Sequence, residues 1–206
     1  RFPNVLLHPT RILPLSFLLA VAVGTLLLTL PVARAGEGRA DVLTAAFVAT
    51  SAVCVTGLST VPTGTYWSTF GHVVILLLIQ VGGFGVMTLA TLIGLVVRGR
   101  LGLRETLLMQ EATRAGVLQQ VRGTLGQIAI MVLVIEASVT ALLTLRFRDY
   151  TDSLGEAVWY GLFHAVSAFN NAGFSLYDNN LEAHPTDLWL LTPIWAAIVL
   201  GGLGFP

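Results

Sequence analysis

The sequence contains no lysine and a single cysteine, and charged side chains make up only 11% of its 206 residues. An average soluble domain carries about 25% charged residues, so this chain lacks the polar side chains that cover a water-facing surface. Its eleven basic residues, all arginine, are balanced by eleven acidic ones. The balance itself says nothing about a nucleic-acid partner, and the sequence shows no basic groove for one. One cysteine excludes an internal disulfide, and the valines beside Cys54 indicate a packed thiol.

Motifs of enzymes are also missing. The chain has no nucleophile elbow, Walker loop, dinucleotide-binding glycine motif or zincin histidine pair. Ser51 and Ser167 belong to no recognised pattern of a serine nucleophile with its base, and His72, His164 and His184 do not have the spacing of metal ligands. We therefore predict that the protein is not an enzyme and that this chain holds no cofactor and no resident metal.

Long uncharged runs are the feature that the chain does have. Residues 13–32 form an uncharged run of 20 residues between Arg11 and Arg34, which is long enough for a helix to cross about 30 Å of hydrocarbon. The next uncharged stretch, residues 42–97, holds 56 residues and has room for two crossings. We predict a first spanning helix at 13–32.

Arginine positions decide how often the stretch 42–97 crosses the membrane. If both of its halves crossed, the Arg-rich segment 98–122 would lie opposite Arg1 and Arg11, against the positive-inside tendency. If residues 42–60 instead enter and return, both basic clusters lie in the cytoplasm. The composition agrees, because about twelve helix-forming residues, too few to span, are followed by glycine and proline. We therefore predict a re-entrant half-helix here and a spanning helix over 67–97.

The same order of elements then recurs. Residues 125–145 are predicted to span, 157–169 to form a second half-helix, and 188–206 to begin another span. The predicted organisation is a first repeat at 1–97, a cytoplasmic Arg-rich linker at 98–122 and a second, truncated repeat at 123–206. Because the chain begins without methionine and ends inside an apolar run, we expect both ends to be cuts in a longer protein.

An internal repeat supports this organisation. Shifting the sequence by 116 positions aligns residues 47–60 with 163–176 and gives six identities in fourteen, including Gly57 with Gly173. A second match aligns 81–85 with 200–204 at a shift of 119. Close packing of helices at small residues is an alternative explanation for these Gly-Gly pairs alone. Paired helix–loop–helix units are expected when several copies surround one axis.

The loops after the half-helices are predicted to bind ions through their backbone. Non-helical backbone at membrane depth leaves peptide groups unpaired, unless they line a water-filled cavity or bind something. Rings of carbonyl oxygens replace the hydration shell of potassium in its filters, and glycine permits the required backbone angles. The predicted filter residues are Val55, Thr56, Gly57 and Leu58 in the first loop, and Asn171, Ala172, Gly173 and Phe174 in the second.

Three segments carry a family resemblance. Residues 51–59, 80–88 followed by 110–112, and 167–174 resemble the Trk/Ktr/HKT superfamily of potassium transporters, and are most similar to the Ktr-type membrane subunit. The resemblance implies four repeats with one filter glycine each, of which this chain would be the first two. It also implies a membrane homodimer, a cytosolic nucleotide-binding regulatory subunit, and potassium selectivity where the filter positions are glycine.

The predicted fold is thus an all-α membrane protein with potassium-channel-like units of helix, re-entrant pore helix with extended filter loop, and helix. We expect a multi-pass protein of the plasma membrane, in contact with lipid, that takes up K⁺. A sodium or unselective monovalent cation transporter of the same architecture, and a non-transporting membrane anchor, remain alternatives. Channel-like transport and coupling to Na⁺ or H⁺ are both open.

A few isolated charges complete the candidates. Glu136 stands alone in the predicted span 125–145, where an intramembrane carboxylate is either functional or paired with a neighbouring helix. Asp178, Glu182 and Asp187 follow the second filter loop on the outer side. There they either raise the local cation concentration or belong to a solvated loop.

Overall fold

The chain is all-helical throughout the part that the structure describes. The computed structural model describes residues 9–99, 114–182 and 184–203, with side chains for 14–85, 126–182 and 184–203. Over these residues there is no strand, and Arg34 and Trp67 form one isolated bridge. The helices of the first half are α1 (Pro9–Leu28), the 3-10 turn η2 (Pro31–Ala33), α2 (Val42–Val53), α3 (Thr63–Tyr66) and α4 (Thr69–Gly99). Those of the second half are α6 (Arg114–Phe147), α7 (Leu154–Phe169) and α8 (Leu188–Gly202).

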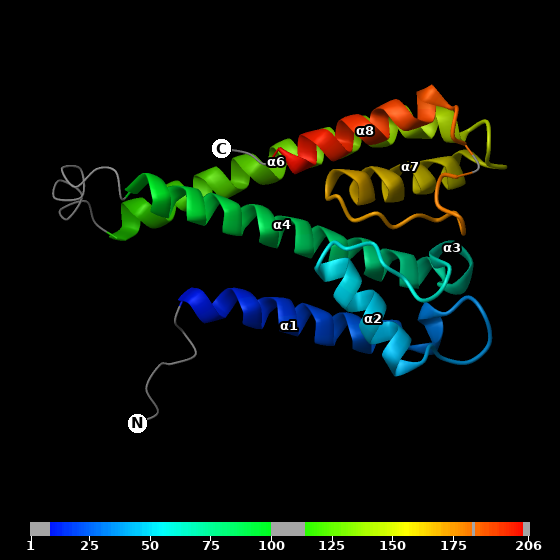
Figure 1. The fold of residues 1–206 in the computed structure, drawn as a ribbon, viewed down its shortest axis with the longest axis horizontal. Helices are drawn as coiled ribbons and strands as arrows, with labels where there is room; N and C mark the ends of the chain where they lie inside the picture. Colours follow the sequence, from blue (N-terminus) through cyan, green and yellow to red (C-terminus); the bar gives the residue numbers. More distant parts are fainter. Residues whose placement is uncertain (1–8, 100–113, 183, 204–206) are drawn as a thin grey trace.

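In each half a short helix lies beside the long helix that precedes it. Figure 1 shows α2 between α1 and α4, near the end of α1 and the start of α4, and α7 alongside α6 and α8. The order long helix, short helix therefore occurs twice, and each pair is followed by a further helix, α4 with 31 residues and α8 with 15. The two halves meet where α4 packs against α7.

Side-chain caps set the starts of the short helices. Asp41 accepts a hydrogen bond from the Leu43 amide at 3.1 Å and begins α2, and Ser153 accepts one from the Glu156 amide at 3.2 Å and begins α7. Such caps satisfy amides that have no partner within the helix. α2 has 12 residues and α7 has 16, so the sequence-based prediction of two short helices is confirmed at the level of local structure.

The ends of some predicted helices differ from the observed ones. The predicted span 13–32 ends at Leu28, because Pro31 disfavours helical backbone at Leu30 and begins the 3-10 turn. The one-turn helix α3 was not expected. Residues 98–99 and 114–122 of the predicted linker are helical, and the linker's middle, 100–113, lies outside the described residues.

One helical segment of the described chain is long and apolar enough to cross a membrane, namely Gly126–Phe147 with 22 residues. It agrees with the span predicted at 125–145. Shorter apolar segments are Pro14–Leu28, Val42–Val53, Thr69–Gly85 and Leu188–Gly202. The spans predicted at 13–32, 67–97 and 188–206 extend into residues whose side chains are not described, and they stay predictions.

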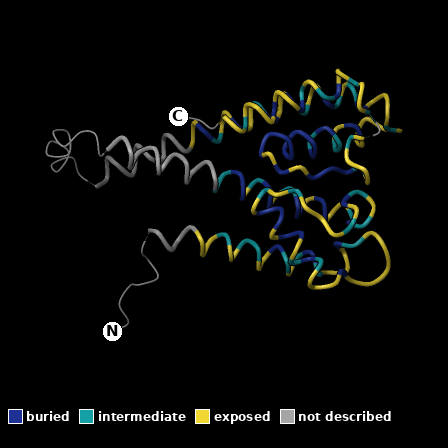
Figure 2. The backbone as a smooth tube through the Cα atoms, viewed as in Figure 1, coloured by how far each residue is buried: buried dark blue, intermediate teal, exposed yellow. Residues whose placement is uncertain are grey.

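Burial concentrates on the short helices. In Figure 2 most of α7 and the inner side of α2 are buried, whereas the outward sides of the long helices are exposed. The exposed outer positions are themselves apolar, for example Leu18, Leu26, Leu133 and Trp189. Exposing such an apolar surface to water is unfavourable, whereas contact with the hydrocarbon of a membrane is favourable. One core joins α1, α2 and α4 with Phe163 and Val166 of α7, and a second joins α6, α7 and α8.

Candidate functional site

The loops after α2 and α7 share one unusual backbone geometry. Val55 and Asn171 have φ values of +55° and +58°, and Gly57 and Gly173 have values of +70° and +73°. These are left-handed conformations, which a β-branched valine rarely adopts. The two pairs are separated by the same 116 positions that relate the sequences. The repeat in the sequence is therefore a repeat in backbone conformation.

Hydrogen bonds of the two loops match as well. The Thr56 amide donates to the Ser51 carbonyl at 2.9 Å, and the Ala172 amide donates to the Ser167 carbonyl at 2.7 Å. Each bond closes the last turn of its short helix. The chain leaves both helices in the same direction relative to the helix axis.

The two loops touch at their glycines. A Cβ atom built on Gly57 would overlap the Ala172 carbonyl oxygen and lie 3.0 Å from the Cα of Gly173. One built on Gly173 would lie 3.6 Å from the Cα of Gly57. Both positions combine a left-handed φ with close backbone approach, the two situations that favour glycine. The structure thus brings the two predicted filter glycines together.

The four predicted residues of each loop differ in exposure. Leu58 is 62% exposed, whereas its counterpart Phe174 is 3% exposed. The Phe174 carbonyl accepts a hydrogen bond from Ser167 Oγ at 2.7 Å, which occupies one of its lone pairs. Val55 and Gly57 are half-buried, Ala172 is buried, and Thr56, Asn171 and Gly173 are exposed.

A cavity of about 390 Å³ opens beside the two glycines. Its walls are residues 57–63 of the first half, except Leu58, and residues 173–180 of the second, except Leu176 and Asn179. Asp178 is in this wall and accepts a hydrogen bond from Thr65 Oγ1 at 3.0 Å. Of the three acidic residues predicted to follow the second loop, Asp178 is the one in the cavity wall.

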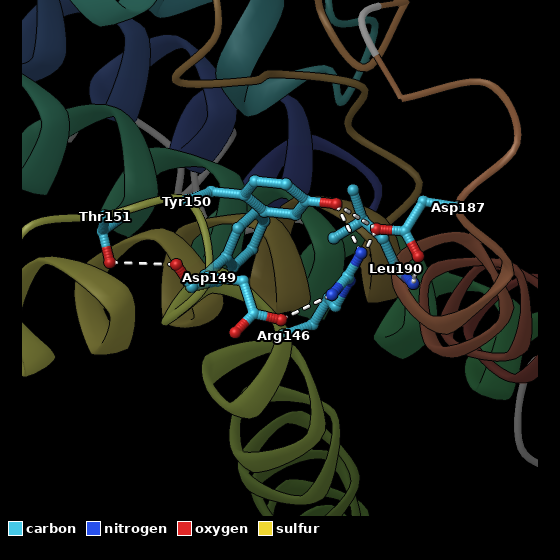
Figure 3. A network of polar contacts seen from close by, with 7 residues as sticks. Arg146, Asp149, Tyr150, Thr151, Asp187 and Leu190 are labelled. Carbon is cyan, nitrogen blue, oxygen red and sulfur yellow. Dashed lines mark hydrogen bonds and ion pairs between the residues drawn. The ribbon is translucent and has the colours of Figure 1, made fainter.

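Asp187 has a structural role instead. As Figure 3 shows, it lies beside Arg146 and Tyr150. Its Oδ2 accepts from Arg146 Nε and from the Tyr150 hydroxyl, both at 2.7 Å, and its Oδ1 accepts from the Leu190 amide at 3.2 Å as the N-cap of α8. Burial acts to raise the pKa of Asp187, but the bonds from Tyr150 and Arg146 together bring it below its ordinary value. This group ties α6 to α8.

The second loop has additional support from its own helix. His164, buried on α7, lies 3.0 Å through Nε2 from Ser175 Oγ and 2.8 Å through Nδ1 from the Tyr160 carbonyl. In the first half, Ser51 Oγ and Thr56 Oγ1 are hydrogen-bonded at 2.9 Å. Within the described residues no three His, Cys, Asp or Glu side chains are grouped as metal ligands.

The Gly-Gly pairs let α4 and α8 approach the ends of the short helices. A Cβ on Gly82 would overlap the carbonyl of Val53, the last residue of α2. A Cβ on Gly201 would overlap the carbonyl of Phe169, the last residue of α7. Close packing of helices at small residues, the alternative explanation for the Gly-Gly pairs, therefore holds for Gly82 and Gly201. The same packing of a glycine on the end of a short helix occurs in both halves.

Sequence reasoning missed two residues. Gln80 on α4 and Asn170 at the end of α7 contact Glu136 on α6, so that three helices contribute to one buried polar cluster. Glu136 is 4% exposed. Its pairing with neighbouring helices was one of the two alternatives stated from the sequence. One feature of the sequence could have indicated Gln80: it is the only residue with an amide or charged side chain among residues 73–97.

A long helix followed by a short one in each half, an apolar outer surface and two matching loops are typical of an all-helical membrane protein with an internal repeat. Comparison with known families matches residues 12–206 to TrkH, described as a cation transport protein. The chain belongs to the TrkH family of cation transport proteins, and it is therefore not an enzyme, as predicted.

Similar proteins agree with this assignment. The chain is 38% identical to Ktr system potassium uptake protein B of Bacillus subtilis over 198 residues, which are 96% of this chain and 44% of that protein. It is 35% identical over 207 residues to potassium/sodium uptake protein NtpJ of Enterococcus hirae, with 97% of this chain and 44% of that protein covered. Ktr system potassium uptake protein D of Bacillus subtilis is 33% identical over 200 residues, which are 97% of this chain and 44% of that protein. The chain spans less than half the length of these relatives. The predicted relationship to Trk/Ktr membrane subunits is confirmed.

Proposed function

We propose that the chain forms the first two of four repeats of a potassium uptake subunit, in which α2 and α7 are re-entrant pore helices and the loops after them line the ion path. The observation that carries this proposal is the meeting of two loops of equal backbone geometry at Gly57 and Gly173. Two loops are half of a four-sided ring. Selective transport then requires the complete four-repeat protein.

The lengths of the short helices support re-entry. At 1.5 Å per residue, α2 is about 18 Å long and α7 about 24 Å long, both short of the roughly 30 Å of hydrocarbon. Each helix ends at its loop with its carbonyl groups directed along the axis. The partial negative charge of these ends favours a cation at the loops.

The backbone angles support ion binding by carbonyls. In a regular strand successive carbonyl groups point to opposite sides. A left-handed φ at every second residue, as at Val55 and Gly57 and at Asn171 and Gly173, turns successive carbonyls toward one side. The proposed ligands are the carbonyl oxygens of Val55, Thr56, Gly57, Leu58, Asn171, Ala172, Gly173 and Phe174. Phe174 contributes least, because Ser167 already binds its carbonyl.

The ion and the partners are proposals drawn from the relatives. Two relatives are named as potassium uptake proteins of a Ktr system, and a third as a potassium/sodium uptake protein. We assign potassium as the preferred ion because both filter positions of this chain are glycine, with sodium uptake as the second candidate. The complete subunit would be a homodimer of the plasma membrane with a cytosolic nucleotide-binding regulatory subunit, and segment 98–122 would face the cytoplasm.

Flux measurements test this function. The complete four-repeat protein in liposomes should carry K⁺ and discriminate against Na⁺, whereas residues 1–206 alone should give no selective flux. Sodium flux as large as potassium flux would select the sodium or unselective alternative. No cation flux from the complete, correctly inserted protein would support a membrane anchor instead.

A further inference from the structure

A cluster of three polar side chains, of which Glu136 and Asn170 are buried and Gln80 is half-buried, lies behind the second loop. Glu136 Oε2 accepts a hydrogen bond from Gln80 Nε2 at 3.2 Å, and Glu136 Oε1 accepts one from Asn170 Nδ2 at 3.1 Å. Asn170 Nδ2 also donates to Gln80 Oε1 at 3.2 Å. Each side chain therefore contacts the other two. The cluster joins α4, α6 and the end of α7.

Asn170 connects this cluster to the loop. It caps the C-terminus of α7. Its backbone N–H donates to the Val166 carbonyl at 3.1 Å, and its side-chain Nδ2 donates to the same carbonyl at 2.9 Å. The next residue, Asn171, is the first with a left-handed φ. Gly83 of α4 leaves room for the Asn170 side chain, since a Cβ there would overlap Asn170 Oδ1. The side chain is thus held from three helices immediately before the loop begins.

The first loop has no such cluster. Its residue equivalent to Asn170 is Cys54, which is exposed, so the packed thiol predicted from the valines beside it is wrong. The residue equivalent to Glu136, at the same shift of 116, is Ala20. The duplication therefore produced two loops of equal backbone geometry, of which only the second is tied to the neighbouring helices by these polar groups.

We propose that Glu136 is a positioning residue for ion discrimination, which acts by holding Asn170 and thereby the start of the second loop. This inference rests on the proposed function of the loops. Glu136 touches no proposed carbonyl ligand, so it acts through Asn170 rather than by binding the ion. Removing its carboxylate takes away the acceptor of Gln80 Nε2 and one of the three acceptors around Asn170 Nδ2, and the two side-chain amides then reorient to find other partners. A shift of Asn170 moves Asn171 and the carbonyls that follow it.

The test uses the complete four-repeat protein in liposomes and measures the K⁺/Na⁺ permeability ratio from reversal potentials. Glu136→Leu should lower this ratio at least tenfold. Glu136→Gln keeps an oxygen that accepts from Asn170 and should restore the ratio to within about threefold of the unmodified protein, a factor worth about 0.65 kcal/mol. Ser138→Ala is the matched control, because Ser138 lies on the same helix and bonds only the Val134 carbonyl, and the ratio should not change. A merely structural role would lower the amount of folded protein without changing the ratio.

A second variant keeps the test decisive. If Glu136→Leu does not insert, Gln80→Leu takes its place, with a reduced ratio expected. Asn170→Ala combined with Glu136→Leu should be no worse than either change alone, because both act at one position. An unchanged ratio in inserted Glu136→Leu or Gln80→Leu overturns the inference, as does an equal loss in Ser138→Ala. Absence of selective flux in the unmodified protein would instead contradict the proposed function.

Discussion

Gly57 and Gly173, 116 positions apart in the chain, lie with their backbones in contact; both have a left-handed φ, and a Cβ on Gly57 would overlap the Ala172 carbonyl oxygen. The contact is the point at which the two repeats meet beside the cavity. If the loops bind ions through their carbonyls, these two positions control the geometry of the ring.

Serine at either glycine is expected to lower the K⁺/Na⁺ permeability ratio of the complete protein. A left-handed φ costs a residue with a Cβ roughly 1–2 kcal/mol, and the loop relaxes by moving its carbonyls. Gly57→Ser should have the larger effect, tenfold or more, because its Cβ overlaps the Ala172 carbonyl, whereas that of Gly173 only reaches ordinary contact distance. Reversal potentials measure both.

Gly155→Ser is the control for this pair. Gly155 lies on α7, and a Cβ there meets nothing within 4 Å. Gly64 also lies outside the two loops, but a Cβ there would overlap the Leu176 carbonyl, so it is not neutral. If the K⁺/Na⁺ permeability ratio is unchanged in folded Gly57→Ser and Gly173→Ser proteins, the assignment of the two loops to the ion path is wrong.

The contact between Arg146 and Asp187 is expected to stabilise the second half. Asp187→Asn keeps an oxygen to cap α8 but loses the ion pair, and Asp187→Ala loses both. The loss of a helix cap alone costs about 1 kcal/mol. The thermal midpoint of the detergent-solubilised protein should therefore fall in the order unmodified, Asp187→Asn, Asp187→Ala. Equal midpoints for all three would show that the contact adds no stability.

Acid is expected to weaken the same contact. The pKa of Asp187 is lowered in the folded protein, so its stabilising contribution is present above the unfolded pKa of about 3.9 and is lost as the pH falls through the folded value. The groups around it are Arg146, Tyr150, Asp149 and His184, which stacks on Tyr150 with ring centres 4.5 Å apart. The thermal midpoint of the unmodified protein should drop more steeply below about pH 4 than that of Asp187→Asn. Parallel curves would exclude Asp187 as the titrating group.

Re-entry of α2 predicts which side of the membrane each loop faces. In a protein in which Cys54, the only cysteine of this chain, is replaced by alanine, Gln119→Cys should react with a membrane-impermeant reagent only from the cytoplasmic side. Asn179→Cys, in the loop before α8, should react only from outside. Labelling of Gln119→Cys in sealed cells would mean that α2 crosses the membrane fully.

The sequence by itself determined the local features. It predicted the class of fold, the two short helices with their last residues near Val53 and Phe169, and the repeat that pairs Gly57 with Gly173. These depend on information carried by neighbouring residues, such as the length of an apolar run, a capping side chain or a glycine after a helix. The early end of α1 at Leu28 also had a local cause in Pro31, which counting uncharged residues overlooked.

Only the tertiary structure decided which distant residues meet. Glu136 could have paired with any neighbouring helix, and its partners Gln80 and Asn170 lie 56 and 34 positions away. Asp187 could have faced the cavity with Asp178, but the packing of α6 against α8 places it on Arg146. The contact of Gly57 with Gly173 likewise required α4 to pack against α7. A hydrophobic pattern specifies that a helix is buried on one side, but the rotation and register of each helix follow from how all the side chains fit together.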